Sequence, residues 1–282
     1  MKVSFITVCY RTPNLVRLLL RGIEEARFAF PFEYILVDNG GDGTADMVRE
    51  RFPWVTVIDP GANLGFAKAN NLAIAQAKGE YVMLTNPDLT VFAGEMEKLI
   101  ATADALPESG VFAPWIESPN GTRQENCVRF PHVLIPAYQR TILGRLPWGK
   151  RALHAYHMRD VDHTLLHDAD SVYGAAMLIR QDVIRKIGGL DERFFMYYED
   201  VDFCRRVWEA GWKVTFVPHA RFVHYHQRES LIRAPWEIVT NRLVRIHIAS
   251  AVRYFMKYAR APKEYGAPVR VEQGHGQEQE TN

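Results

Sequence analysis

The amino-acid sequence predicts an α/β fold, with a mostly parallel sheet flanked by helices and a helical extension at the C-terminal end. Three observations support this prediction. Short runs of β-branched residues alternate with stretches of helical spacing through the first half of the chain. Of the 282 residues, 48% are hydrophobic and 12% aromatic, which is enough to bury a large core. No stretch approaches the roughly 18 consecutive apolar residues of a membrane-spanning helix.

The first half alternates strands and helices at the spacing of βαβ units. The predicted strands are Val3 to Cys9, Glu33 to Asp38, Trp54 to Ile58 and Glu80 to Thr85. The predicted helices begin at Pro13, at Asp42-Gly43-Thr44, at Phe66 and at Phe92. Ligands of such sheets bind beyond the carboxyl ends of the strands. This rule draws attention to Cys9, Tyr10, Asp38, Asn86 and Asp88.

The second half is organised differently. Residues 115–170 contain several prolines but no clean period, so we expect an irregular insertion over the sheet, part of which could be helical. Order returns at 169–179, and beyond it the sequence predicts strands at 212–217 and 221–226 and helices at 181–187 and 198–210. We therefore expect a main domain over residues 1–230, a basic helix within 231–261 and a disordered polar tail over 262–282.

Charge and cysteine content argue against several classes of protein. Lysines and arginines number 34 and acidic residues 33, a balance that argues against a dedicated nucleic-acid binder. Cys9, Cys127 and Cys204 are scattered, so neither a disulfide framework nor a structural zinc site is expected. The apolar run at the N-terminus is short and Arg11 follows it, unlike a signal peptide. These features favour a soluble protein of a reducing compartment, the cytoplasm.

Three segments at the predicted strand ends carry groups suited to binding. Asp38, in VDNGGDGT, could accept hydrogen bonds from a nucleoside or serve only as an Asx-turn or helix-capping residue. In NLGFAKANN, Gly65 permits close approach of a ligand to the backbone, although a plain helix start has the same pattern. Asp88, in Asn86-Pro87-Asp88, could ligate a divalent cation that bridges a diphosphate, but the tripeptide is also typical of a turn.

An acidic run follows a cluster of aromatic residues near position 200. Glu199, Asp200 and Asp202 begin a predicted helix, where acids stabilise the helix dipole. The preceding FFMYY could instead place one acid at the mouth of an apolar pocket, tuned as a general base. Further on, His224 and His226 share one face of a predicted strand. They could ligate a metal, though histidines in such places are more often structural.

These segments occur in one order: VCYRT, VDNGGDGT, NLGFAKANN, TNPD, YGAAMLIR, GGLDERFFMYYEDVDFCRR and then a histidine after a strand. Together they resemble the family 2 glycosyltransferases of the GT-A fold, a Rossmann-like sheet. The resemblance is greatest to the rhamnosyltransferase-like branch of bacterial cell-surface polysaccharide synthesis, and it covers about residues 3–258. It implies an inverting transfer of a sugar from a nucleoside diphosphate sugar to a hydroxyl group, with a divalent metal, Mg²⁺ or Mn²⁺.

The resemblance also implies roles for individual residues. Asp200 matches the general base, beside Glu199, and Asp88 matches the metal-binding aspartate, with His224 as a metal ligand in some relatives. Donor or nucleotide contacts are expected from Thr7, Cys9, Tyr10, Asp38, Gly65, Asn71, Asn86 and Asp88. Two positions depart from the family pattern. Asn86 replaces the first carboxylate of a DXD motif, and Arg11 follows Tyr10 where the branch often has Asn.

Two other functions remain open on the sequence. A sugar-1-phosphate nucleotidylyltransferase would carry a glycine-rich basic loop after the first strand, where this chain has Tyr10-Arg11-Thr12-Pro13. A non-catalytic nucleotide-sugar-binding scaffold of a glycan assembly complex is the other alternative, against which Asp38, Asp88 and Asp200 argue.

The expected partners follow from the same resemblance. The donor is expected to be dTDP-rhamnose or a UDP-hexose, and the acceptor a glycan or a polyprenyl-linked glycan. The helix expected at 236–260 is basic and apolar, so it could contact an anionic membrane or a second subunit, or pack on the main domain. A peripheral location on the inner face of the cytoplasmic membrane and a homodimer are therefore both considered.

Overall fold

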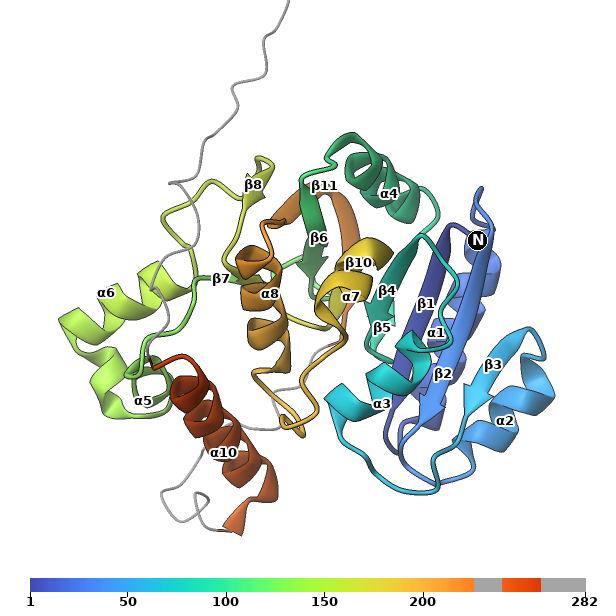
Figure 1. The fold of residues 1–282 in the computed structure, drawn as a ribbon, viewed down its shortest axis with the longest axis horizontal. Helices are drawn as coiled ribbons and strands as arrows, with labels where there is room; N and C mark the ends of the chain where they lie inside the picture. The colour runs from blue at the N-terminus through green and yellow to red at the C-terminus, as the bar shows by residue number, and fades with distance from the viewer. Residues whose placement is uncertain (226–239, 260–282) are drawn as a thin grey trace, which may run out of the picture.

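One mixed sheet of nine strands forms the centre of the computed structural model, which describes residues 1–225 and 240–259 (Figure 1). Its first half is parallel, in spatial order β3-β2-β1-β4, and is made of β1 (Val3–Cys9), β2 (Phe32–Asp38), β3 (Val55–Ile58) and β4 (Tyr81–Thr85). The order continues from β4 through β10 (Ala176–Arg180), β6 (Ser109–Glu117), β11 (Lys213–His224) and β5 (Leu89–Thr90), and β8 (His167–Asp168) also pairs with β11. Strand β10 is antiparallel to both neighbours, whereas β6 and β11 are parallel. The predicted α/β class is confirmed.

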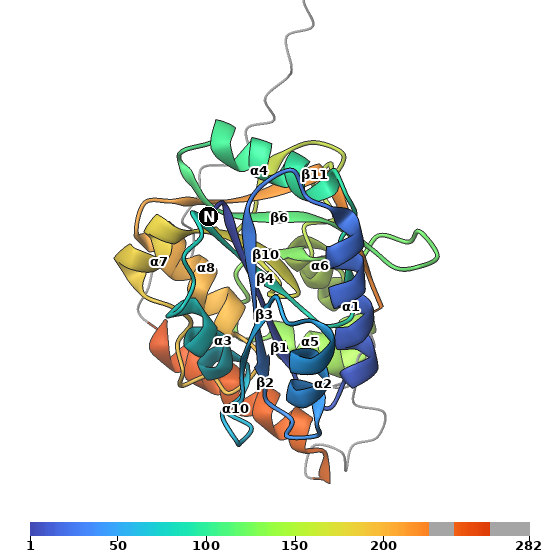
Figure 2. The same ribbon diagram turned by 90° about the vertical axis from the view of Figure 1, so that its right-hand side faces the viewer.

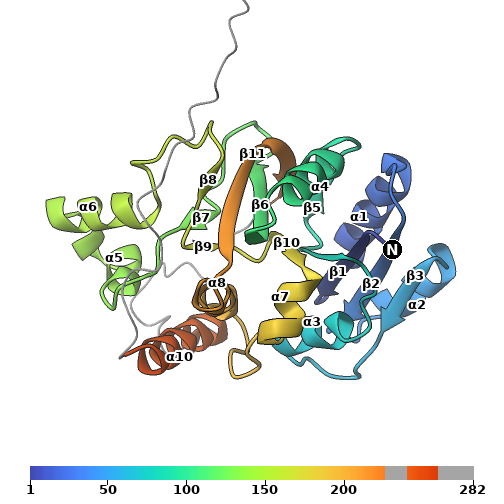
Figure 3. The same cartoon turned by 45° about the horizontal axis from the view of Figure 1, so that its top comes forward.

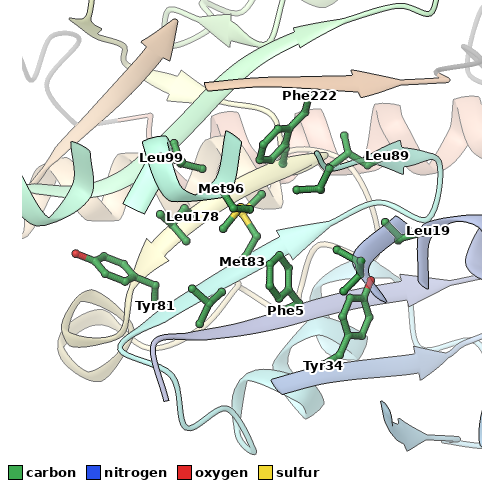
Figure 4. Packing of buried hydrophobic residues seen from close by; sticks show 14 of the residues in the cluster. Phe5, Leu19, Tyr34, Tyr81, Met83, Leu89, Met96, Leu99, Leu178 and Phe222 are labelled. Atoms are coloured by element: carbon green, nitrogen blue, oxygen red, sulfur yellow. The ribbon is translucent and has the colours of Figure 1, made fainter. Parts of the chain in front are cut away.

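Helices cover both faces of this sheet (Figure 2). One face carries α1 (Pro13–Ala26), α2 (Thr44–Arg51) and α4 (Glu95–Ala105), and the other carries α3 (Phe66–Ile74), α7 (Gln181–Ile187) and α8 (Glu199–Glu209). Because successive side chains of a strand point to opposite faces, β1 serves both layers. Phe5 packs in the first layer with Leu19 and Met96, and Ile6 packs in the second with Ala69 (Figure 4 shows the first layer).

Two predicted strands near the C-terminal end are one continuous strand. Strand β11 joins the segment expected at 212–217 to residues 221–224 of the segment expected at 221–226, and its register against β6 shifts between Val217 and Arg221. Position 226 lies outside the described residues. Pro218 lies in that irregularity, where a strand can accommodate a residue that has no N–H to donate. The segment expected at 169–179 is instead divided. Its first part is β9 (Ser171–Val172), which pairs with β7 (Cys127–Val128) in a separate small sheet, and β10 follows.

The insertion at 115–170 is more regular than the sequence predicts. It contains α5 (Ile135–Arg140), the 3-10 helix η1 (Ile142–Arg145) and α6 (Pro147–Tyr156), which pack on one another at the left of Figure 1. Ile135 and Tyr156 are buried together with Val128, so the insertion has a small hydrophobic core of its own.

The C-terminal helix packs on the main domain. Helix α10 (Arg242–Lys257) buries Val244, Ala251 and Tyr254, and Lys257 forms ion pairs with Asp191 and Asp202. The remaining positions of the helix expected at 236–260, and the tail at 262–282, lie outside the described residues. No helix within 1–225 and 240–259 is long and apolar enough to cross a membrane.

Candidate functional site

The polar residues singled out by the sequence gather at one edge of the sheet. Cys9 lies opposite Asp38 at the ends of β1 and β2, and Thr85 at the end of β4 lies opposite Ala176 at the start of β10. His224 ends β11, which runs parallel to β6 and therefore finishes at the same edge. The strand ends thus form the edge at which ligands of such sheets bind.

Asp88 and His224 are in contact although 136 residues separate them in the chain. Strand β5 pairs His224 with Leu89, and the backbone N–H of Tyr225 donates to the Asp88 carbonyl oxygen over 2.9 Å. This short ladder brings His224 Nε2 to 3.1 Å from Asp88 Oδ1. The structure therefore brings the two candidate metal ligands together, and their binding of a metal stays a prediction.

Gln124 determines which nitrogen of His224 carries hydrogen. The Gln124 Nε2 amide donates to the His224 carbonyl oxygen over 2.7 Å and to Ser118 Oγ over 3.0 Å. Its Oε1 must then accept from His224 Nδ1, which lies 2.8 Å away. An Nδ1–H that donates to Gln124 leaves the Nε2 lone pair directed at the Asp88 carboxylate. Two acceptors at this distance require a proton or a metal ion between them.

The donor set at this position fits a divalent cation. A carboxylate oxygen and an imidazole nitrogen are suitable ligands for Mn²⁺, and carboxylates suit Mg²⁺. Within the described parts of the chain, no group of three or more His, Cys, Asp or Glu residues gathers in metal-binding geometry. Asp88 and His224 would supply two ligands to such an ion, and magnesium sites at phosphates commonly take further ligands from the diphosphate and water.

Asp38 organises the loop that follows β2. Its Oδ1 accepts from the Gly40 N–H over 3.0 Å and its Oδ2 from the Ala45 N–H over 2.9 Å, and the residue is buried. These two hydrogen bonds are those expected of a turn and helix-capping residue, the structural alternative considered for Asp38. The Cys9 thiol also lies 3.9 Å from Oδ1, so a nucleoside hydrogen bond would fall to Oδ2, and that contact stays a prediction.

Three other strand-end residues differ in exposure. Thr7 is fully buried, and its hydroxyl lies 2.7 Å from Tyr34 Oη and 2.6 Å from Thr85 Oγ1. Cys9 is also buried, which raises the pKa of its thiol to about 12. Tyr10 is exposed at the edge with the Arg11 guanidinium over its ring. Of the three, only Tyr10 exposes its side chain to solvent, whereas Thr7 and Cys9 support the edge from beneath.

Gly65 lies against protein backbone. Its φ is +82°, and a Cβ at this position would overlap the Phe195 carbonyl oxygen and ring. The next residue, Phe66, donates its N–H to that carbonyl over 2.6 Å. Asn39 holds the same loop from the other side, because it accepts from the Leu64 N–H over 2.8 Å. The sequence analysis expected Gly65 to permit the close approach of a ligand. In the structure it is Phe195, in the segment before Glu199, that lies close to the Gly65 backbone.

Asn71 joins helix α3 to the loop that precedes the aromatic segment. Its Oδ1 accepts from the Leu190 N–H over 2.9 Å, and its Nδ2 donates to the Leu190 carbonyl and to Glu192. A Cβ on Gly189 would overlap the same amide. The structure therefore gives Asn71 a positioning contact. For Asn86, the backbone N–H donates to the Ala175 carbonyl over 2.9 Å, which ties the end of β4 to the start of β10.

Glu199 and Asp200 are adjacent acids with different surroundings. Asp200 Oδ2 accepts from the Gly174 N–H over 3.1 Å, and its Oδ1 accepts from the Val201 N–H over 2.8 Å. Burial raises the pKa of Asp200, and these two hydrogen bonds oppose that rise. Glu199 is buried, and its Oε2 has no hydrogen-bond partner among the described residues. Burial and the charge of Asp200 hold the pKa of Glu199 well above its ordinary range. The pair therefore favours a proton on Glu199 and the negative charge on Asp200.

The backbone before these acids is held in an uncommon conformation. Tyr197 and Tyr198 have φ values of +71° and +68°, a region that costs non-glycine residues energy and often occurs at functional sites. Helix α10 supports this conformation, because Ser250 Oγ donates to the Met196 carbonyl over 2.9 Å and Tyr254 packs on Tyr198. Figure 3 shows α10 beside the start of α8. Of the roles considered for the C-terminal helix, packing on the main domain is confirmed.

Three contacts at the site have no signal in the sequence. Gln124 lies in the insertion, 100 residues before its partner His224, and nothing in its surroundings predicts a role. Gly174 precedes β10 and supplies one N–H to Asp200. Asn39 was visible only as part of VDNGG, and its pairing with residues 63–65 depends on the way two loops meet.

Sequence comparison finds two family models that together match most of the chain, and several relatives. The family model described as "Glycosyl transferase family 2" matches residues 4–188, and the model described as "Glycosyl transferase family group 2" matches residues 147–248. The N-acetylglucosaminyl-diphospho-decaprenol L-rhamnosyltransferase of Mycobacterium tuberculosis is 33% identical over 221 residues, which cover 73% of this chain and 70% of that protein. The rhamnosyltransferase WbbL of Escherichia coli K12 is 22% identical over 240 residues, covering 80% of this chain and 83% of that protein.

Comparison of structures identifies the fold as GT-A. The crystal structure of GalNAc-T7 with UDP, GalNAc and Mn²⁺ has a TM-score of 0.62 at 15% identity. The match covers 92% of this chain and 48% of the GalNAc-T7 chain. The mannosyltransferase PcManGT of Pyrobaculum calidifontis, in complex with GDP-Man and Mn²⁺, has a TM-score of 0.55 at 18% identity and covers 93% of this chain and 76% of its own. With the family match over residues 4–188 and a rhamnosyltransferase relative at 33% identity, this chain belongs to glycosyl transferase family 2 and is a glycosyltransferase.

Proposed function

We propose that this enzyme transfers a sugar, with inversion, from a nucleoside diphosphate sugar to a hydroxyl group of a polyprenyl-linked glycan. The donor we favour is dTDP-rhamnose, with a UDP-hexose as the second choice. The name of the mycobacterial relative supports both halves of this proposal, since it specifies an L-rhamnosyl group and a diphospho-decaprenol acceptor. In this scheme residues 1–230 are the catalytic domain, and the insertion at 115–170 lies on the acceptor side.

The observation that carries the mechanism is the unequal environment of Glu199 and Asp200. An inverting transfer needs a base that removes the proton of the acceptor hydroxyl as that oxygen attacks the anomeric carbon. Asp200 suits this role, because two backbone N–H groups hold its oxygens in place while burial raises its pKa towards the range of a useful base. Glu199, which keeps its proton, leaves Asp200 as the charged member of the pair.

The leaving diphosphate is expected at the Asp88 and His224 end of the same edge. A divalent ion bound there, Mg²⁺ or Mn²⁺, would supply positive charge that neutralises the diphosphate as it departs. Gln124 orients His224 so that Nε2 can act as a ligand. Tyr10 and Asp38 are proposed to contact the nucleoside, from the exposed and the buried side of the first two strand ends.

The test is a pair of variants at the two acids. Asp200→Asn removes the basicity and keeps the shape, so turnover should fall by about 10²–10⁴-fold while donor affinity stays within a few-fold. The substitution also replaces one acceptor by a donor that faces a backbone N–H, which should cost about 1–3 kcal/mol of stability. Glu199→Gln keeps a neutral side chain at a position that is already protonated, so it should lower turnover less.

Turnover and melting temperature are measured on the same preparations, with Mn²⁺ and a panel of nucleotide sugars. If Asp200→Asn keeps normal turnover but melts at a lower temperature, Asp200 is only a structural residue of α8 and the proposed base is wrong.

A further inference from the structure

The α5–η1–α6 unit exposes large apolar side chains. Ile142 is 70% exposed and Trp148 59%, and Val133, Leu134 and Leu143 are exposed as well. The unit packs through its opposite side, where Ile135 and Tyr156 are buried with Val128. It therefore forms an outward surface that projects at the left of Figure 1. Exposed apolar side chains gathered in this way usually mark a site of interaction.

The stretch of chain that forms this surface contains basic residues and no acidic ones, and so does the stretch that contains α10. Residues 126–159 contain no Asp or Glu, and neither do residues 240–259, which include α10. At the average density of the chain, 33 acids in 282 residues, these two stretches together would carry about six. Arg145, Lys150 and Arg151 are exposed next to the apolar residues, and none has a carboxylate within salt-bridge distance among the described residues. Such a surface is complementary to negative charge.

The unit is also attached next to the candidate base. Tyr173 packs against the small core that holds Ile135 and Tyr156, and the following residue, Gly174, donates to Asp200. On the other side, Nη2 of Arg140 in α5 lies 2.7 Å from Nδ1 of His247 in α10. The basic, apolar surface is thus joined on two sides to the segments that position Glu199 and Asp200.

We propose that the α5–η1–α6 surface docks on an anionic lipid bilayer. Ile142, Leu143 and Trp148 would enter the interface between headgroups and acyl chains, and Arg145, Lys150 and Arg151 would contact the negatively charged headgroups. Surfaces that bind peripherally to membranes typically expose Trp, Leu or Ile side chains beside Lys and Arg. This inference deepens the proposed function, on which it rests for the lipid-linked acceptor: docking here would present to Asp200 a glycan that its polyprenyl chain anchors in the bilayer.

Co-flotation of the full-length chain with lipid vesicles tests the docking independently of enzymatic activity. The protein should bind vesicles of phosphatidylcholine mixed with phosphatidylglycerol, bind pure phosphatidylcholine much less, and lose binding as salt is raised. Each basic side chain near an anionic surface contributes roughly fivefold in partitioning, so Lys150→Glu/Arg151→Glu should lower the partition coefficient by at least ~30-fold. The matched control is Arg21→Glu/Arg51→Glu, which makes the same charge change on exposed residues of α1 and α2.

A second pair of variants tests the apolar part of the surface. Ile142→Ser should weaken partitioning by about tenfold or more, because the side chain can no longer be buried in the interface. Leu18→Ser, at a 60% exposed position of α1, should change nothing. Equal loss in test and control variants, or no binding by the parent protein, would overturn the proposal. So would a dimer in solution that Ile142→Ser converts to a monomer, because the surface would then be an interface between two copies.

Donor hydrolysis or sugar transfer by the same proteins, measured without vesicles, reports on the proposed function separately. Full activity with no vesicle binding refutes the docking surface and leaves the glycosyl transfer intact. Vesicle binding with no transfer supports the surface and refutes the proposed reaction.

Discussion

Replacing Gly65 by alanine should disturb the site more than its backbone conformation alone explains. Gly65 has φ +82° and ψ 176°, a region that is essentially restricted to glycine. Gly188 has nearly the same conformation, φ 78° and ψ 179°, but a Cβ there would meet nothing within 4 Å. Gly188→Ala therefore measures the backbone strain by itself, about 1–3 kcal/mol. Gly65→Ala adds an overlap with the Phe195 carbonyl oxygen and ring.

The additional cost can be worked out from the contacts. The overlap forces Phe195 away, which costs about 1–3 kcal/mol as for other overpacked sites. It also disrupts the Phe66 N–H to Phe195 carbonyl hydrogen bond of 2.6 Å, worth about 1 kcal/mol. Gly65→Ala should thus lose about 2–4 kcal/mol more than Gly188→Ala. At roughly 2–4 °C per kcal/mol in a protein of this size, the extra fall in melting temperature is about 4–16 °C.

The displaced segment leads directly into Glu199 and Asp200, so turnover should respond as well. We expect Gly65→Ala to lower turnover at a temperature where it is still folded, while Gly188→Ala keeps the parent rate. Urea unfolding and turnover of the two variants decide the matter. Equal losses of stability would refute the close approach of Phe195, and an unchanged rate would separate this loop from the catalytic segment.

Three further outcomes are expected. Asp88→Ala should abolish the metal-dependent part of the thermal stabilisation by a nucleoside diphosphate, and His224→Ala should weaken that stabilisation by a smaller factor. If both variants bind Mn²⁺ and nucleotide like the parent, the metal assignment is wrong. Glu199→Gln should become more stable than the parent as the pH rises above about 5. In the parent, the raised pKa keeps Glu199 protonated in the folded state while the same side chain ionises in the unfolded state, so the stability present at low pH is lost as the pH rises. A pH-independent difference in the free energy of unfolding between the two proteins would contradict this. Asp38→Ala should weaken nucleotide binding in calorimetry even without metal, while Asp42→Ala, in the same loop, should leave it within a few-fold; equal effects would make Asp38 a loop residue only.

Much of the fold could be predicted because its signals are local. Strands β1, β2 and β4 are short, continuous runs of apolar and β-branched residues, and each is located within one residue of its predicted position. Their separation by helical stretches fixes a parallel order with few alternatives. The same order places Cys9, Asp38 and Asp88 at one edge, so the location of the candidate site also follows from the sequence.

The insertion and the end of the chain were harder to predict. Residues 135–156 form three short helices whose stability comes from packing of Ile135 and Tyr156 on Val128, not from a repeating pattern. Pro218 suggested a break between two strands, but a register shift against β6 keeps β11 continuous. The C-terminal helix was recognisable, yet its partner was not, since the residues that receive it lie more than 40 positions earlier.

By itself, then, the sequence determined the fold class, the alternation of strands and helices in the first half, the family resemblance and the edge of the sheet at which the polar residues meet. Only the tertiary structure decided which of those residues touch one another. Asp88 meets His224 across 136 positions, Gln124 orients that histidine across 100, and Gly174 reaches Asp200 across 26. The physical reason is that periodicity and propensity act over one or two turns of chain, whereas a hydrogen bond forms between whichever groups the packed sheet brings within about 3 Å.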